Sequence, residues 1–537
     1  MMRILTASDR ALLVEAADLD EAMRLNLAWE GLPGVVERVP GARTVLVHFD
    51  PLRISAEKLA STLKATRTDA AHAPHTAEVT IPVRYDGEDL DEVAALLGVS
   101  PEELVNRHLA ADWRVAFSGF APGFGYAVSS DPLFDVPRRS SPRTRVPAGS
   151  VGLAGRFTGV YPRESPGGWQ LIGRTDAVMW DIDRDPPALL VPGAVVRFVR
   201  AGRSRYESGA DTPDVGRNAA ERPTSGVSAA GVERAGHPDA AMIEITRPAL
   251  QLLVQDLGRP GRAELGVAAS GVADRTALRD GNRAVGNAPD AAVLECVGGV
   301  GLGFTGNGVA AITGATGEAT IVDFDGIERP VPMGAPFATF AGDELHLAAP
   351  THGLRYVIAV RGGIRALEEL GSRSTDTLSG LGPAPLVAGD VLEVGIHAPY
   401  AVDPYPRPRA LPTSGDLVEL DITLGPRDEW FTASALQTLT GQEWSVTPRS
   451  DRVGIRLHGD VPLERAVTDE LPSEGAVTGA IQVPPDGQPV LFLPDHPLTG
   501  GYPIVGALTD RCLDLAGQLP PGIRLRFRIV GRSGDVG

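Results

Sequence analysis

A chain of 537 residues, 43% of them hydrophobic, is long enough for three or four domains that each bury a core. Its formal net charge of -18 disfavours nucleic acids and anionic membranes as partners, because both would repel it. Two cysteines are too few for a disulfide framework or a zinc site, and we expect no metal. No apolar run is long enough to cross a bilayer, and the first residues lack a signal-peptide core, so we expect a cytoplasmic protein.

The lysine content bears on several chemistries. Lys58 and Lys64 are the only lysines, and both fall in a segment typical of a surface helix. A phosphate-binding P-loop requires Gly-Lys-Ser/Thr, which the chain does not contain. A biotin-carrying lysine is not expected in this chain either.

Residues 1–75 predict a small α+β domain. ALLVEA is typical of a strand, and DLDEAMRLNLAWEGL has the apolar spacing of a helix. VVERV and TVLVHF flank a Pro-Gly turn and predict a hairpin. Ser55 is placed to cap a second helix.

Residues 76–200 predict a first β-barrel. Ser100-Pro101 opens a helix that ends near His108, which we interpret either as a structural histidine or as a site residue. The strand WRVAFSGF then leads into residues 117–176, which concentrate glycine, proline, arginine and aromatic residues. Exposed aromatic rings would supply flat contact area, and arginines would supply forks for a carboxylate or phosphate. The alternative is that glycine and proline only shape tight barrel corners.

The candidate binding residues of this first half are His108, Phe120, Pro122, Phe124, Tyr126, Arg143, Arg145, Ser165 and Trp169.

Residues 201–240 are polar and rich in small residues, which predicts a linker. From residue 241 the pattern is all-β, apart from a helix at ADRTALRDGNRAV. A turn followed by alternating residues recurs at VPGAVVRF, FAGDELHL, VAGDVLEV and PPGIRLRF, and SPGGWQLIG resembles LTGGYPIVG. The recurrence predicts duplicated barrels over 76–200, 241–400 and 401–537.

Polar clusters in the second half leave several alternatives open. Asp256 and Arg259 fit either a structural ion pair or a site. Glu295 ends an apolar strand, where a carboxylate is costly unless it is partnered, and this favours a functional role. The turn GSRSTD, residues 371–376, fits either an oxyanion-holding turn or an ordinary hydroxyl-capped turn.

The candidate binding residues of the second half are Gln255, Asp256, Arg259, Glu295, Arg373, Ser374, Thr375, Asp376, Asp451, Arg452, Glu474, Gln482, Thr499 and Tyr502. They form no Ser-His-Asp order and no nucleophile elbow, so we expect a surface that binds and positions a ligand, and we assign no catalytic residue.

Several strings resemble known families. GFAPGFGYA, SPRTRVPAGSVGLAG and SPGGWQLIGRT resemble the B component of 5-oxoprolinase, the KipI or allophanate hydrolase subunit 1 family. LVQDLGRPGRAELGVAASGVADRTALRDGNRAVGN, LGSRSTD and LPSEGAVTGAIQVPPDGQP resemble its C component, the KipA or allophanate hydrolase subunit 2 family, which is similar to biotin-dependent carboxyltransferases. The chain thus resembles a B–C fusion. The resemblance implies a mainly β fold with a small α+β N-terminal domain and three cyclophilin-like β-barrels.

The resemblance also implies an activity. It is the ATP-dependent hydrolysis of the lactam 5-oxo-L-proline to L-glutamate, with ATP as co-substrate and a separate 5-oxoprolinase A component as partner. The arginine-rich loop 138–145 and Arg373 are our candidates for the cations that such a reaction needs on phosphate or oxyanion charge. One alternative is the carboxyltransferase part of a biotin-dependent urea carboxylase or urea amidolyase, acting on urea or allophanate with a carrier on another chain. A second is a KipI/KipA-like kinase regulator, which a permanent fusion of inhibitor and antagonist disfavours. A homo-oligomer is compatible with either enzyme.

Overall fold

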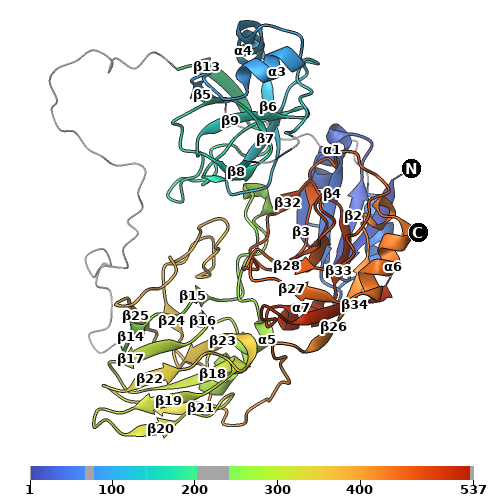
Figure 1. The fold of residues 1–537 in the computed structure, drawn as a ribbon. Helices are drawn as coiled ribbons and strands as arrows, with labels where there is room; N and C mark the ends of the chain where they lie inside the picture. The colour runs from blue at the N-terminus through green and yellow to red at the C-terminus, as the bar shows by residue number, and fades with distance from the viewer. Residues whose placement is uncertain (1, 67–77, 140, 142, 202–240, 532–537) are drawn as a thin grey trace, which may run out of the picture.

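The computed structural model describes residues 2–66, 78–139, 141, 143–201 and 241–531. The predicted linker lies outside these residues except at its first position. Figure 1 shows the N-terminal domain, in blue, against the third barrel, in orange and red, with the first barrel above them and the middle barrel below. The mainly β fold with a small α+β N-terminal domain is confirmed.

The N-terminal domain follows the predicted order, with one additional strand at its start. Its antiparallel sheet has the order β1-β2-β4-β3, and both helices are capped as local chemistry requires. Asp18 accepts the Glu21 N–H at the start of the first helix, and Ser55 accepts the Lys58 N–H at the start of the second. The elements are β1 (Arg3–Ser8), β2 (Ala11–Glu15), α1 (Leu19–Ala28), β3 (Val35–Pro40), β4 (Thr44–Phe49) and α2 (Ala56–Ala65).

The first barrel is a seven-stranded sheet of order β12-β9-β10-β7-β6-β13-β5. A bridge between Arg84 and Arg174 joins its two ends, so the sheet is nearly closed. β8 and β11 form a separate two-stranded sheet. The elements are β5 (Glu78–Val83), α3 (Leu90–Leu96), α4 (Pro101–Ala110), β6 (Trp113–Ser118), β7 (Gly125–Val128), β8 (Arg143–Val146), β9 (Ser150–Ala154), β10 (Phe157–Val160), β11 (Ser165–Gly167), β12 (Gln170–Arg174) and β13 (Val195–Arg200).

The middle barrel consists of a seven-stranded and a five-stranded sheet that share one apolar core, with α5 packed against β18 and β23. Its elements are β14 (Met242–Arg247), β15 (Gln251–Gln255), η1 (Ala263–Leu265), α5 (Arg275–Val285), β16 (Val293–Val297), β17 (Val300–Phe304), β18 (Gly308–Thr316), β19 (Ala319–Val322), β20 (Glu328–Pro330), β21 (Pro336–Thr339), β22 (Glu344–Leu347), β23 (His352–Val360), β24 (Ile364–Arg365) and β25 (Val391–Val394).

The third barrel closes in the order β26-β33-β30-β31-β28-β27-β34, beside a two-stranded sheet of β29 and β32. Its elements are β26 (Leu417–Leu424), η2 (Asp428–Trp430), α6 (Ala433–Gly441), β27 (Trp444–Val446), β28 (Gly454–His458), β29 (Glu474–Gly475), β30 (Ala480–Gln482), β31 (Val490–Phe492), β32 (Thr499–Gly500), β33 (Ile504–Leu508), α7 (Asp510–Ala516) and β34 (Arg524–Gly531).

The first and third barrels follow the same plan. In each, the last strand runs parallel to the first, β13 beside β5 and β34 beside β26. In each, a buried tryptophan donates from Nε1 to a carbonyl five residues earlier, Trp113 to His108 and Trp444 to Leu439. The repeated strings SPGG and TGG form β11 and β32, the second strands of the two small sheets. In the middle barrel the last strand, β25, is antiparallel to the first.

The N-terminal domain shares a core with the third barrel, far along the chain. Leu5 and Leu46 pack in one apolar cluster with Phe492 and Ile504. The Ala42 N–H donates to the Ser473 carbonyl at 2.8 Å, and Arg427 of the third barrel pairs with Glu15. We call residues 2–201 the first half and residues 241–531 the second half. The chain folds back so that the N-terminal domain of the first half packs against the third barrel of the second half.

We predict that the two halves stay together without a covalent link. Residues 1–201 and 241–537, co-expressed as two chains, should elute as one 1:1 complex in gel filtration, because the shared apolar core is buried between them. Leu46→Asp, which places a carboxylate in that core, should weaken the complex. Independent elution of the two wild-type halves would contradict the prediction.

Candidate functional site

The aromatic residues of the glycine-rich loop are buried, so the prediction of an exposed contact surface is wrong. Phe124, Tyr126 and Trp169 are 1%, 4% and 6% exposed. Phe124 contacts the edges of Tyr126 and Trp169 at centroid distances of 5.1 Å, which is the favoured geometry for aromatic pairs. Pro122 is also buried, and Phe120 is half-buried with a φ of 63° that turns the loop. These rings form a second, apolar cluster inside the first barrel.

The loop at residues 119–124 forms hydrogen bonds between the two halves. Its Phe120 N–H donates to Thr499 Oγ1 at 3.1 Å, and its Gly123 N–H donates to the Leu265 carbonyl at 3.1 Å. A Cβ atom on Gly119 would lie 2.6 Å from Thr499 Oγ1, which is too close for any side chain. Glycine is therefore required at residue 119 for the close approach of the two halves.

Arg143 and Arg145 do not extend from a free loop, because residues 143–146 form strand β8. Arg143 donates to Asp89 at 2.7 Å, and Arg139 donates to the same carboxylate at 2.8 Å. Burial acts to raise the pKa of Asp89. The two arginines and the Leu171 N–H outweigh it and hold that pKa below its usual value. Arg145 has a 75% exposed side chain and pairs with Glu164 at 2.6 Å. These two predicted arginines are thus already paired with the protein's own carboxylates.

His108 lies in the core of the first barrel with no exposed surface. Its ring nitrogens lie 2.8 Å from Tyr85 Oη and 3.0 Å from Thr158 Oγ1, and the rings of Trp113 and Phe198 pack around it. Burial lowers the pKa of His108 to about 3, so the ring is neutral at ordinary pH. The geometry favours the structural alternative over a site residue.

The turn at residues 371–376 binds an anion, but that anion is Asp256. Ser372 and Ser374 donate from Oγ to Asp256 Oδ1 at 2.6 Å, and the Arg373 N–H donates to Oδ2 at 2.6 Å. The guanidinium of Arg373 points elsewhere and pairs with Glu368 at 2.9 Å. These donors are therefore not free to hold a substrate oxyanion.

The remaining neighbours in this region support the same loops. Gln255 donates from Nε2 to the Thr375 carbonyl at 2.8 Å. Thr375 in turn donates from Oγ1 to the Pro383 carbonyl at 2.8 Å. Arg259 forms no ion pair with Asp256 and donates to the carbonyls of Ser374 and Glu369.

Arg452 is a buried clamp between the middle and third barrels. It donates to both oxygens of Asp495, at 3.0 and 3.1 Å, and also contacts Glu295 and the Gly271 carbonyl. Glu295 also accepts the Ala273 N–H at 2.7 Å. The unfavourable free energy of burying the Glu295 carboxylate is therefore offset by Arg452 from the third barrel. No ligand is needed to explain a carboxylate at this strand.

Asp495 links the clamp to the next loop. It accepts hydrogen bonds from Ser270 Oγ at 2.6 Å and from Thr377 Oγ1 at 2.7 Å. Burial acts to raise the pKa of Asp495, but Arg452 and these hydroxyls hold it below its usual value. The adjacent Asp376 is 1% exposed, and burial together with the charge of Asp495 raises its pKa.

Two arginines from different halves interact electrostatically with Asp376. Arg259, 2% exposed, belongs to the loop after β15, and Arg163 belongs to the turn between β10 and β11. Burial lowers the pKa of both guanidiniums, and in both cases the Asp376 carboxylate opposes that shift. The Nη1 atoms of Arg163 and Arg259 are buried, and neither has a hydrogen-bond partner among the described residues.

Spare cationic donors at this junction make residues 163, 259 and 376 the candidate site. Arg163 was not predicted from the sequence, although it stands within the glycine-rich stretch. Its Nη1 atom lies 3.0 Å from where a Cβ of Gly380 would be, which places it against the loop that follows Asp376.

The other predicted residues are spread around this junction. Glu474 pairs with Arg427 at 2.7 Å on the side that faces the N-terminal domain. Tyr502 lies beside Arg465, and Gln482 donates to the Tyr502 carbonyl at 3.4 Å. Asp451 caps its own turn by accepting the Val453 N–H at 2.9 Å. Ser165 is part of β11, where it pairs with Val146.

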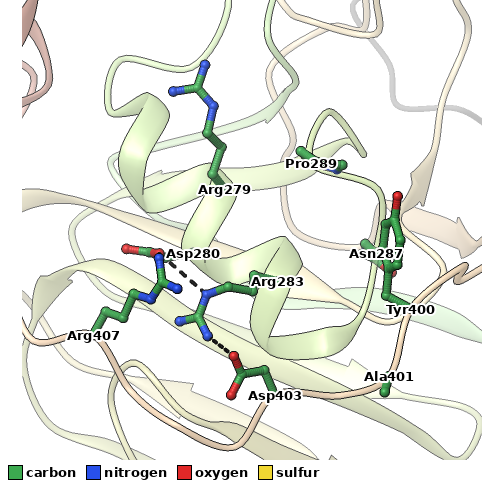
Figure 2. Close-up of a pocket in the computed structure, with 9 residues that line it drawn as sticks. All are labelled: Arg279, Asp280, Arg283, Asn287, Pro289, Tyr400, Ala401, Asp403 and Arg407. Atoms are coloured by element: carbon green, nitrogen blue, oxygen red, sulfur yellow. Dashed lines mark hydrogen bonds and ion pairs between the residues drawn. The ribbon is translucent and has the colours of Figure 1, made fainter.

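A hollow of about 490 Å³ lies elsewhere, beside α5 of the middle barrel, and none of the predicted residues lines it. Figure 2 shows Arg283 between Asp280 and Asp403, while Arg407 approaches Asp280 from the neighbouring segment. These ion pairs already balance much of the charge in the hollow, so we do not place the site there.

The part of the chain that the structure describes contains no His, Cys, Asp and Glu cluster able to hold a metal ion. No helix in that part is long and apolar enough to span a membrane.

Comparisons with known proteins show that both halves match carboxyltransferase domains. Residues 2–190 match the family model described as carboxyltransferase domain, subdomain C and D, and residues 265–529 match the one described as subdomain A and B. The crystal structure titled TTHA0988 superposes with a TM-score of 0.78 at 34% identity, and covers 97% of this chain and 99% of that one. The Kluyveromyces lactis urea carboxylase, with a TM-score of 0.50 at 21% identity, covers 75% of this chain and 37% of that one and shares the fold.

Curated relatives then define the family. The B component of 5-oxoprolinase from Bacillus subtilis is 38% identical over 191 residues, which are 33% of this chain and 80% of that protein. The C component from Escherichia coli is 33% identical over 298 residues, which are 53% of this chain and 90% of that protein. The chain belongs to the families of the 5-oxoprolinase B and C components, joined in that order.

We predict that the Arg452 clamp dominates the stability of the second half. Arg452→Gln should lower the free energy of unfolding by about 3–5 kcal/mol, because it leaves Glu295 and Asp495 buried without their cation. Arg456→Gln, on the exposed face of the next strand, is the matched control and should change it by less than about 0.5 kcal/mol. Urea denaturation of both variants measures this, and equal losses would refute the clamp.

A second prediction concerns pH. The folded-state pKa of His108 is about 3 against an ordinary 6.5, so below pH 6.5 the unfolded chain binds a proton that the folded chain does not. This group's contribution to stability is present above pH 6.5 and is lost as the pH falls towards 3. Between pH 6 and pH 4, wild type should lose about 1.4 kcal/mol per pH unit more than His108→Gln. Identical slopes for wild type and His108→Gln would contradict the prediction.

Proposed function

We propose that this chain is the fused B–C component of a 5-oxoprolinase, which hydrolyses 5-oxo-L-proline to L-glutamate with ATP and a separate protein like the 5-oxoprolinase A component. One observation carries the proposal: the halves that match the B and C components meet at a buried junction to which each contributes an arginine with a spare donor. A site built from both halves explains why two components of one enzyme would be joined in one chain.

The carbonyl carbon of a lactam is a poor electrophile, so its hydrolysis requires an activating step. Transfer of the ATP γ-phosphoryl group to the lactam oxygen would activate the ring carbon for attack by water. The C–N bond would then break to free the amine, and a second water would release phosphate and leave the new carboxylate. In such a mechanism this chain would hold the lactam in a fixed orientation, and Arg163 and Arg259 are the candidate cations for that binding.

We place no ATP contact on this chain. Its two lysines, Lys58 and Lys64, lie in α2 of the N-terminal domain, and the sequence has no Gly-Lys-Ser/Thr loop. The role that we propose for this chain is to bind and orient the lactam.

A second candidate is carboxyl transfer. It is favoured by the carboxyltransferase family models and by relatives such as the urea amidolyase of Lachancea kluyveri, 30% identical over 312 residues that are 17% of that protein. In this case a biotin carrier on another chain would supply the carboxyl group.

The two candidates predict different activities. The purified chain alone should show little 5-oxoproline-dependent ATP hydrolysis, and addition of its cognate A-component protein should produce L-glutamate and ADP together. Full activity of the chain alone would contradict the need for a partner. Biotin-dependent carboxylation of urea, without lactam hydrolysis in the presence of the partner, would replace the proposal with the second candidate.

A further inference from the structure

We infer that Arg163 and Arg259 together bind the carboxylate of the substrate, so that the junction selects a small amide that carries a carboxylate over a neutral one. The inference rests on the proposed function, because it takes the amide substrate to bind at this junction. It goes further by naming the group that is recognised and the two residues that recognise it.

The first argument is the unused donors. A guanidinium carries five N–H donors, and within the described part of the chain Arg259 uses Nε and Nη2, on the carbonyls of Glu369 and Ser374. Its Nη1 atom and that of Arg163 are buried without a hydrogen-bond partner among the described residues. A buried donor left unpaired destabilises the folded state, and more so when it is charged. A bound anion would recover that free energy.

The second argument is that nearby carboxylates are already occupied. Asp256 accepts from two serine hydroxyls and two backbone N–H groups. Asp495 is held by Arg452, Ser270 and Thr377. Among the described residues, Arg163 and Arg259 form no ion pair within 4.0 Å, although the Asp376 carboxylate acts on both, so their Nη1 donors remain open to a ligand.

The third argument is the position of the two cations. Arg259 leaves the middle barrel after β15, and Arg163 leaves the first barrel after β10. Both act on Asp376, which accepts the Leu378 and Ser379 N–H groups at 2.9 Å from its own loop. A carboxylate between the two guanidiniums would therefore contact both halves. Urea has no carboxylate and would gain nothing from this arrangement.

Binding of two lactams to the full chain tests the inference. Isothermal titration calorimetry should show that 5-oxo-L-proline binds at least tenfold more tightly than 2-pyrrolidinone, the same ring without the carboxylate, which is about 1.4 kcal/mol. Arg163→Gln should remove that preference, because it deletes the cation from a turn where its Nη1 atom has no hydrogen-bond partner among the described residues. Arg156→Gln, an exposed arginine between β9 and β10 of the same barrel, is the matched control and should keep the preference.

Equal binding of the two lactams by wild type, or an unchanged preference in a folded Arg163→Gln variant, would overturn the inference. A thermal melt like that of wild type establishes that the variant is folded. The assay with the partner protein separates the two claims. A carboxylate preference without lactam hydrolysis supports the inference and rejects the proposed function, whereas hydrolysis without the preference does the reverse.

Discussion

The arrangement of the second half depends on one buried cation. Arg452 has no exposed side-chain surface, and the carboxylates of Glu295 and Asp495 that surround it come from two different barrels. Three charges taken out of water are tolerated only where their geometry is close to ideal, so this contact favours the observed relative position of the two barrels. Through Asp495 the same contact holds Thr377, next to the buried Asp376, and so positions the loop on which the candidate site depends.

The first half is held against the second half by close backbone contacts and by a shared apolar core. Gly119 and Gly123 bring the glycine-rich loop against Thr499 and Leu265, while the N-terminal domain packs on the third barrel. The aromatic rings of this stretch form a second apolar cluster beside the main core of the first barrel, which explains the aromatic content of the stretch. We expect the ligand at the polar junction where Arg259 contacts the Ser374 carbonyl and Arg163 lies against Gly380, on either side of Asp376 in the sequence.

Local patterns predicted much of the fold and little of the site. The caps at Ser55 and Ser100 and the recurrence of SPGG and TGG depend on neighbouring residues, so they could be read from the sequence, and the duplicated barrels followed. The partner of a guanidinium depends instead on how distant segments meet. Nothing local to Arg143 indicates Asp89, and nothing local to Glu295 indicates Arg452. For the same reason the sequence suggested Arg143 and Arg145 as ligand contacts and missed Arg163.

A crystal structure of the chain with 5-oxo-L-proline would test the central claim most directly, which is that the substrate binds where the two halves meet. The account predicts the ligand carboxylate within about 3 Å of guanidinium nitrogens of both Arg163 and Arg259. A ligand bound within one barrel, or in the hollow beside α5 with both arginines uninvolved, would contradict it.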